Sequence, residues 1–245
     1  MRNIWTIAKR ELKAYFISPI AYVIIFMILL TLSIFFYIDI YYAVSSQGYI
    51  PDIKRTLELL VFPLFFLAVP AITMRTMADE NRMGTIELLL TAPVRDWELI
   101  VGKWLGSVLF FIIILAITWI YPLILNPMIN PGVDQGMLVS GYLGIILLMS
   151  AMCAIGVFVS SLFSNQIAAL IVTLIVILVL WVAGVPGQVI TGSLGDFLRF
   201  FSFSDHYYNT FLTGILDIKD VVFYLSFTAL GLFFGTISVE IKRWK

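Results

Sequence analysis

Long apolar runs alternate with short polar breaks along the whole chain. Because an α-helix rises about 1.5 Å per residue, roughly 20 apolar residues are needed to cross a hydrocarbon core of about 30 Å. The breaks are rich in proline, glycine, serine or charge, as in SSQGYIPDIKR, MADENRMGT and GVPGQVITGS. The pattern predicts an all-α polytopic membrane protein with six transmembrane helices in a single domain over 1–245, at residues 17–40, 57–74, 99–125, 137–163, 167–185 and 221–239.

An amphipathic stretch over residues 1–16 precedes the first run. Apolar side chains recur there at helical spacing, while basic side chains occupy another face. We expect an N-terminal elbow helix that lies flat on the inner leaflet, its surface residues being Trp5, Lys9, Arg10 and Lys13. A plain cytoplasmic extension of the first span is the alternative.

Composition and charge support the membrane assignment and orient the chain. Only 12% of the residues are charged, whereas a soluble domain typically spends about a quarter of its residues on charge. The formal net charge of zero gives no reason to expect a nucleic-acid partner. With both termini on one side, that side carries eleven lysines and arginines against four on the other, so both termini are expected to be cytoplasmic.

The predicted spans contain essentially no ionisable side chain, Asp39 falling at the outer end of the first one. An intrinsic proton or sodium relay, which needs such groups within the membrane, is therefore not expected. The P-loop pattern GxxxxGK[ST] is also missing, since GKW at 102–104 lacks the preceding glycine and the hydroxyl. Any active transport must draw its energy from a separate ATPase.

The sequence shows no motif typical of a catalytic or a metal site. Cys153 is the single cysteine and His206 the single histidine, so neither a disulfide nor a multi-histidine metal site can form within the chain. No GxSxG elbow surrounds Ser150 or Ser160, and paired intramembrane aspartates are absent. We expect no catalytic residues, no metal and no cofactor on this chain.

The most informative stretch lies between the second and third predicted spans and reads TMRTMADENRMGTIELLLTAPVRDWELIVGKWLG. Its charges alternate in sign, Gly84 interrupts the helix, and Pro93 should close a short apolar helix before the next one begins at Trp97. A solvated loop with no further role is the alternative interpretation. Two GxxxG pairs, Gly102/Gly106 and Gly231/Gly235, permit close helix approach in the third and sixth spans.

This stretch resembles the ABC-transporter permeases of the type-2 exporter family, in which an E…GT-x-E-LLL-x-x-P pattern forms the coupling helix against the nucleotide-binding subunit. The basic entrance KRELKAYFISPIAY, the link GVFVSSLFSNQ and the closing EIKRW are similar to that family too. The C-terminal part is similar to gliding-motility-associated short permeases. The resemblance implies a coupling region over 76–97 whose ATPase-contacting residues are Asp79, Glu80, Arg82, Gly84, Thr85, Ile86, Glu87, Leu88, Leu89 and Pro93.

The resemblance also implies an assembly and an activity. Two permeases, identical or related, would carry two ABC ATPase subunits, which bind Mg-ATP, in a bacterial inner membrane and would export a hydrophobic or amphipathic substrate. An outer re-entrant hairpin over 186–216 would cap the exit, where Asp205 and His206 contact a substrate headgroup or an extracytoplasmic protein partner, or are ordinary interfacial polar residues. The alternatives are a force-transmitting subunit that acts on an extracytoplasmic protein without moving a solute, and a passive channel.

The coupling assignment makes a first prediction. Replacing Glu87 with lysine reverses a charge within the proposed ATPase contact, so Glu87→Lys should uncouple ATP hydrolysis from transport while membrane insertion stays intact. ATP turnover and transport of the reconstituted complex measure the two activities. Unchanged transport in this variant would contradict the coupling-helix assignment.

Overall fold

The computed structural model of the chain describes residues 2–46, 51–85, 94–190 and 192–243. Within these residues six helical stretches are long and apolar enough to cross a membrane, and the described chain contains no strand. The all-α, six-span prediction is thereby confirmed. The stretches are α2 (Pro19–Ser45); α3 (Ile53–Pro63) with η1 (Leu64–Ala68) and α4 (Val69–Met83); α6 (Asp96–Thr118) with α7 (Ile120–Leu125) and η2 (Asn126–Met128); α8 (Gln135–Leu162); α9 (Gln166–Val182) with α10 (Gly184–Val189); and α13 (Ile218–Arg243).

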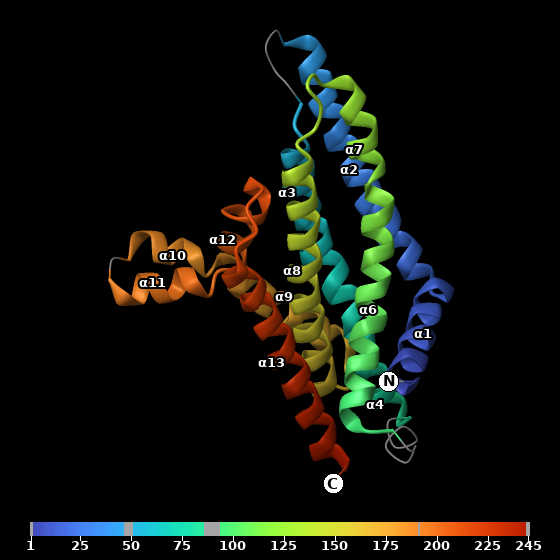
Figure 1. The fold of residues 1–245 in the computed structure, drawn as a ribbon. Helices are drawn as coiled ribbons and strands as arrows, with labels where there is room; N and C mark the ends of the chain where they lie inside the picture. Colours follow the sequence, from blue (N-terminus) through green and yellow to red (C-terminus); the bar gives the residue numbers. More distant parts are fainter. Residues whose placement is uncertain (1, 47–50, 86–93, 191, 244–245) are drawn as a thin grey trace.

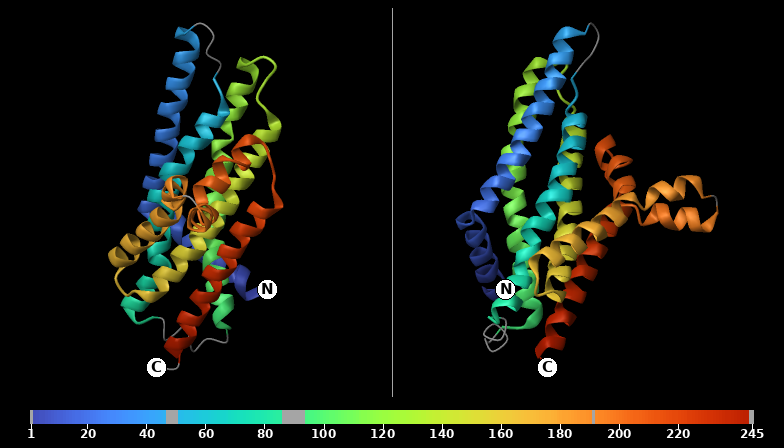
Figure 2. Two further views of the ribbon diagram at one scale, coloured as in Figure 1. Left: turned by 90° about the vertical axis from the view of Figure 1, so that its left-hand side faces the viewer. Right: turned by 180° about the vertical axis from the view of Figure 1, so that it is seen from behind.

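Helix α8 is the centre of the bundle. It packs against α4, α6, α9 and α13, and 78% of its most apolar window is buried inside the protein, against 22% for α2 and for α9. Figure 2 shows α2 and α9 on the outside of the bundle. Most apolar side chains of these two helices therefore face away from the protein core, as expected where lipid or another subunit replaces water.

The two ends of the bundle carry different connections. Helix α1 (Arg2–Ile17) begins and α13 finishes at the same end, where α4 finishes and α6 begins (Figure 1). Helix α2 ends, α3 begins and η2 leads into α8 at the opposite end. The even number of crossings thus brings the flanks of the predicted coupling region beside both chain termini.

A π-helical segment, η1, interrupts the second span between two prolines. Pro63 ends α3 and Pro70 is near the start of α4, and neither ring nitrogen can donate a backbone hydrogen bond. Missing donors on both sides favour a local change in hydrogen-bond register, which the wider i→i+5 turn provides. The span continues through η1 without a break in the helical path.

Glycines let the helices approach closely at the GxxxG pairs. A Cβ on Gly231 of α13 would lie 2.8 Å from the carbonyl carbon of Ala154 in α8, while one on Gly235 would lie 3.2 Å from a side-chain methyl of Ile100. On α6, a Cβ on Gly102 would lie 2.7 Å from Cβ of Ile7, so its close neighbour is α1. Both predicted pairs lie in contact with neighbouring helices.

Helices α10, α11 (Ser193–Phe200) and α12 (Phe203–Tyr208), with η3 (Phe211–Thr213), form the connection to α13. Figure 2 shows α10 and α11 side by side and projecting sideways from the bundle. The side chain of Arg199 donates from Nε to the Gly187 carbonyl at 2.9 Å, while Val189, Leu194 and Phe197 are exposed. This apolar surface suits a membrane interface, and re-entry from the outer side stays a prediction.

The two glycines of α13 provide a matched test of close packing. Gly231→Ala must displace backbone of α8, whereas a Cβ on Gly235 would crowd only a methyl of Ile100 at 3.2 Å and would lie at ordinary contact distance, 3.7 Å, from the nearest backbone atom. Because overpacking typically costs about 1–3 kcal/mol, Gly231→Ala should lower the apparent melting temperature of the detergent-solubilised protein more than Gly235→Ala does. Equal effects of the two substitutions would show that the α8–α13 contact is looser than described.

Candidate functional site

The stems of the predicted coupling region are α4 and α6. Helix α4 ends at Met83, and Gly84 after it takes a left-handed conformation with φ of 69°, while the Thr85 hydroxyl donates to the Glu80 carbonyl at 3.5 Å. Glycine adopts this conformation at no steric cost, which makes it the usual residue after a helix. Helix α6 begins after Arg95, whose backbone N–H donates to Oε2 of Glu98 at 3.2 Å. Local interactions therefore define both the end of α4 and the start of α6.

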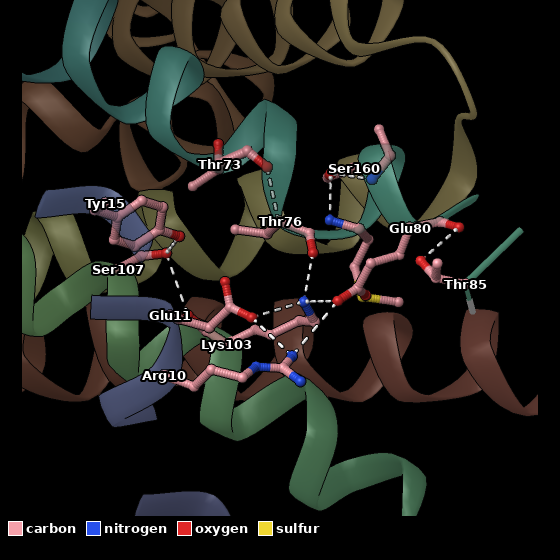
Figure 3. A network of polar contacts seen from close by, with 12 residues as sticks. Arg10, Glu11, Tyr15, Thr73, Thr76, Glu80, Thr85, Lys103, Ser107 and Ser160 are labelled. Atoms are coloured by element: carbon pink, nitrogen blue, oxygen red, sulfur yellow. Dashed lines mark hydrogen bonds and ion pairs between the residues drawn. The ribbon is translucent and has the colours of Figure 1, made fainter. Parts of the chain in front are cut away.

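A buried lysine joins the two stems. The side chain of Lys103, two turns into α6, is 1% exposed, and its Nζ lies 2.7 Å from Oε1 of Glu80 and 3.0 Å from Oε1 of Glu11 in α1 (Figure 3). It also donates to the Thr76 carbonyl of α4 at 2.6 Å. A lysine ammonium has three N–H donors, so each donor has its own acceptor. We call Arg10, Glu11, Glu80 and Lys103 the charge cluster.

The charges of the cluster balance. Arg10 lies 3.1 Å from Glu11 and 3.6 Å from Glu80, so two cations face two carboxylates. Burying an unpaired charge is expensive, and removing one partner of a buried pair typically costs about 3–5 kcal/mol. The cluster therefore makes α1, α4 and α6 depend on one another at the end of the bundle that carries the coupling region.

Lys103 corrects the expectation that the spans hold essentially no ionisable side chain. It lies within the predicted third span, residues 99–125, and it is buried and charged. Sequence reasoning missed its role because Glu11 is 92 residues away and Glu80 is 23 residues away along the chain. The available signal was a lysine at the start of an otherwise apolar run, which requires a counter-charge once the helix is packed.

Helix α1 packs lengthwise on α6, which modifies the expected elbow. The Tyr15 hydroxyl lies 2.9 Å from Oγ of Ser107, and Asn3 donates to Glu98 at 3.1 Å. Ala8 and Tyr15, which belong to the apolar face of α1, are buried within the protein. The glycines of α6 permit this close helix packing. The surface residues proposed for the elbow, Trp5, Lys9, Arg10 and Lys13, are exposed, and their contact with lipid headgroups stays a prediction.

Helix α8 and the start of α9 brace α4 from the other side. Oγ of Ser160 accepts from the backbone N–H groups of Met77 and Ala78 at 3.1 Å each and donates to the Met74 carbonyl at 3.0 Å. Gln166 of α9 hydrogen-bonds the carboxylate of Asp79. On α6, Asp96 forms an ion pair of 2.6 Å with Arg243 of α13. The α4 stem is thus tied to α8 and α9, and the α6 stem to α13.

The predicted coupling residues divide into three groups. Asp79 and Glu80 point into contacts within the protein, whereas Arg82 and Gly84 are exposed at the end of α4, next to the half-buried Thr85. In the described part of the chain no group of three His, Cys, Asp or Glu side chains is placed to hold a metal ion. The remaining predicted residues lie outside the described residues; they are Ile86, Glu87, Leu88, Leu89 and Pro93.

His206 and Asp205, the proposed outer cap, are held by contacts within the protein. Nδ1 of His206 lies 2.6 Å from Oδ1 of Asp220 in α13 and Nε2 lies 3.0 Å from the Phe200 carbonyl, while the ring stacks on Phe223. Both ring nitrogens thus face oxygen atoms of the protein. Asp205 packs against Gly184, where a Cβ would lie 2.3 Å from the carboxylate. Contact of the pair with a substrate or partner stays a prediction.

Comparison with known proteins gives one family. A family model described as "ABC-2 family transporter protein" matches residues 5–239, which takes in most of α1, the first five spans, most of the sixth and the coupling region. A search of curated proteins finds no match. The matched range covers the charge cluster as well as both stems. The chain therefore belongs to the ABC-2 transporter family and is a membrane permease component of an ABC transporter.

Proposed function

We propose that this permease exports a hydrophobic or amphipathic substrate, driven by ATP hydrolysis on separate ABC ATPase subunits that contact the coupling region. The observation that carries the proposal is the charge cluster, in which Lys103 of α6 binds Glu80 of α4 and Glu11 of α1 directly beside that region. If the coupling region were only a solvated loop, its charges would form exposed ion pairs, which contribute only about 0–1 kcal/mol each. The charge cluster is instead buried and joins the two stems to α1.

The cluster supports a mechanical route. A force on the coupling region reaches α4 and α6 together, since the two stems share Lys103, and it reaches α1 through Glu11. Ser160 carries the same displacement from α4 to α8 at the centre of the bundle. Packed interiors transmit strain because they are dense. Closure of the ATPases would in this way move four helices as one unit and switch the access of the substrate pathway.

The assembly we propose has two permease copies, or this permease with a related one, and two ATPase subunits. The low burial of α2 and α9 supports further packing partners on these faces, either lipid or the second permease. The excess of lysine and arginine at the end with the termini supports a cytoplasmic location for that end, with the protein in a bacterial inner membrane.

Lys103 provides the test of the coupling route. Lys103→Met leaves Glu11 and Glu80 facing each other without their buried cation, so the free energy of unfolding in detergent should fall by about 3–5 kcal/mol. Lys103→Arg should destabilise the protein as well, because a planar guanidinium cannot meet three acceptors arranged around an ammonium.

The same variant tests coupling. In nanodiscs, the ATP turnover of the complex that contains Lys103→Met should approach that of the ATPase alone. Lys219→Met, an exposed lysine outside the cluster, is the matched control. Normal permease-dependent turnover in Lys103→Met would refute the route.

Cysteine labelling tests the orientation. Cys153 is buried, so single cysteines introduced at exposed positions label selectively. In spheroplasts, Ser46→Cys should react with a membrane-impermeant maleimide, whereas Arg82→Cys at the end of α4 should react only after permeabilisation. The reverse pattern would place the coupling region outside the cell, where no ATP-hydrolysing partner is available.

A further inference from the structure

Two cavities follow one another along α2, between this helix and the second span. The first has a volume of about 180 Å³, lies where the end of α1 and the start of α2 meet α4, and is lined by Glu11, Ser18, Arg75 and Asp79 together with Tyr15, Thr76 and aliphatic side chains. The second has a volume of about 270 Å³ and is lined almost entirely by apolar side chains of α2, α3, η1 and α4. Ala71 lines both. We call the pair the α2 groove, which is polar near the termini and apolar farther along.

Arg75 is the unusual group in the polar part. Its Nη1 donates to Oγ of Ser18 at 3.3 Å, but its Nε is buried and has no hydrogen-bond partner among the described residues. Within the described chain no carboxylate lies within ion-pair distance of this guanidinium, in contrast to Arg10, Lys103 and Arg243. A half-buried guanidinium whose buried Nε has no hydrogen-bond acceptor is suited to a phosphate oxygen, which it binds by charge-assisted hydrogen bonds.

The other charges of the cavity restrict the ligand further. The carboxylates of Glu11 and Asp79 line the same cavity as Arg75, so a purely anionic ligand would meet repulsion. Glu11 already binds Lys103 and Arg10, and Asp79 accepts from Gln166, but a carboxylate accepts several hydrogen bonds. One cation and two anions around one cavity match a headgroup that carries a phosphate and an ammonium.

The apolar part is nearly as long as one leaflet is thick. It follows α2 from Val23 to Thr31, which at about 1.5 Å per residue is about 12 Å. One leaflet of a bilayer contributes about half of a hydrocarbon core of about 30 Å. Val23, Met27 and Leu67 present apolar side chains along this path. An acyl chain that begins near Arg75 therefore has an apolar lining over most of the thickness of one leaflet.

We propose that the α2 groove binds one glycerophospholipid with an ethanolamine headgroup, taken from the leaflet on the side of the chain termini. Its phosphate binds Arg75 and Ser18, its ammonium donates to Asp79 and Glu11, and one acyl chain lies against α2 and η1. The lipid joins the α1–α2 junction to α4 and shares Glu11 with the charge cluster. It is a resident ligand, so the proposal does not depend on which substrate is transported or on the ATPase contact.

Lipid binding to the delipidated, detergent-solubilised protein tests the headgroup. Native mass spectrometry should show tighter binding of phosphatidylethanolamine than of phosphatidylcholine, which lacks N–H donors, or of phosphatidylglycerol, which lacks the cation. Arg75→Gln should weaken binding of phosphatidylethanolamine about tenfold, the usual effect of losing a hydrogen bond to a charged group. Arg82→Gln removes an exposed arginine two turns away on the same helix and should leave lipid binding unchanged. Equal binding of the three lipids, or an unaltered affinity in Arg75→Gln, would overturn the proposal.

Two further measurements locate the chain and do not depend on the Arg75 variant. Phosphatidylethanolamine with a photoactivatable acyl chain should label the wild-type protein mainly on α2 between Val23 and Thr31, and Ala71→Phe should abolish this labelling by filling the groove. Glycerophosphoethanolamine, the headgroup without chains, should bind much more weakly than the intact lipid. Labelling spread evenly over the exposed faces of α2, α9 and α13, or equal binding of the free headgroup, would count decisively against a lipid site.

Discussion

The arrangement of the helices at the coupling end depends on one buried cation. Lys103 sits where α1, α4 and α6 meet, and its ammonium uses all three of its donors on groups from the other two helices. Desolvating this charge is costly unless every partner is in place. The charge cluster therefore fixes the relative positions of α1, α4 and α6 more than it adds stability. The three helices can pack together only in the arrangement that pairs all of its charges.

Close helix packing supplies the complementary constraint. The glycines at 102 and 106 let α1 approach α6 closely enough for Glu11 to reach Lys103, and Gly231 lets α13 lie against α8. Ser160 then links α8 to α4 through backbone hydrogen bonds. Small residues and buried polar contacts together replace the hydrophobic driving force, which is weak between helices surrounded by lipid. The result is a bundle whose coupling end is bound to its centre.

The sequence predicted the features that depend on local composition. The six spans follow from runs of apolar residues, and the close approach at the glycine pairs follows from their spacing. The sequence did not predict the partners of Lys103, because Glu11 and Glu80 become neighbours only after three helices pack. The packing of α1 against α6 was missed for the same reason, because an apolar helix face can be buried either against lipid or against another helix. Five of the predicted coupling residues, from Ile86 to Pro93, lie outside the described residues, so their contacts stay predictions.

The π-helical segment η1 has a consequence for the coupling end. A π turn holds about one residue more than an α turn, and one residue corresponds to about 100° of rotation around an α-helix. The side chains of α4 therefore point in directions, around the helix axis, that differ from those they would take if α3 continued as a regular α-helix. This rotation is what directs Thr76 and Glu80 toward Lys103, although the segment lies several turns away. Shortening the segment by one residue would turn Thr76 and Glu80 away from the ammonium and bring Met77 and Asn81, which carry no charge, into their positions.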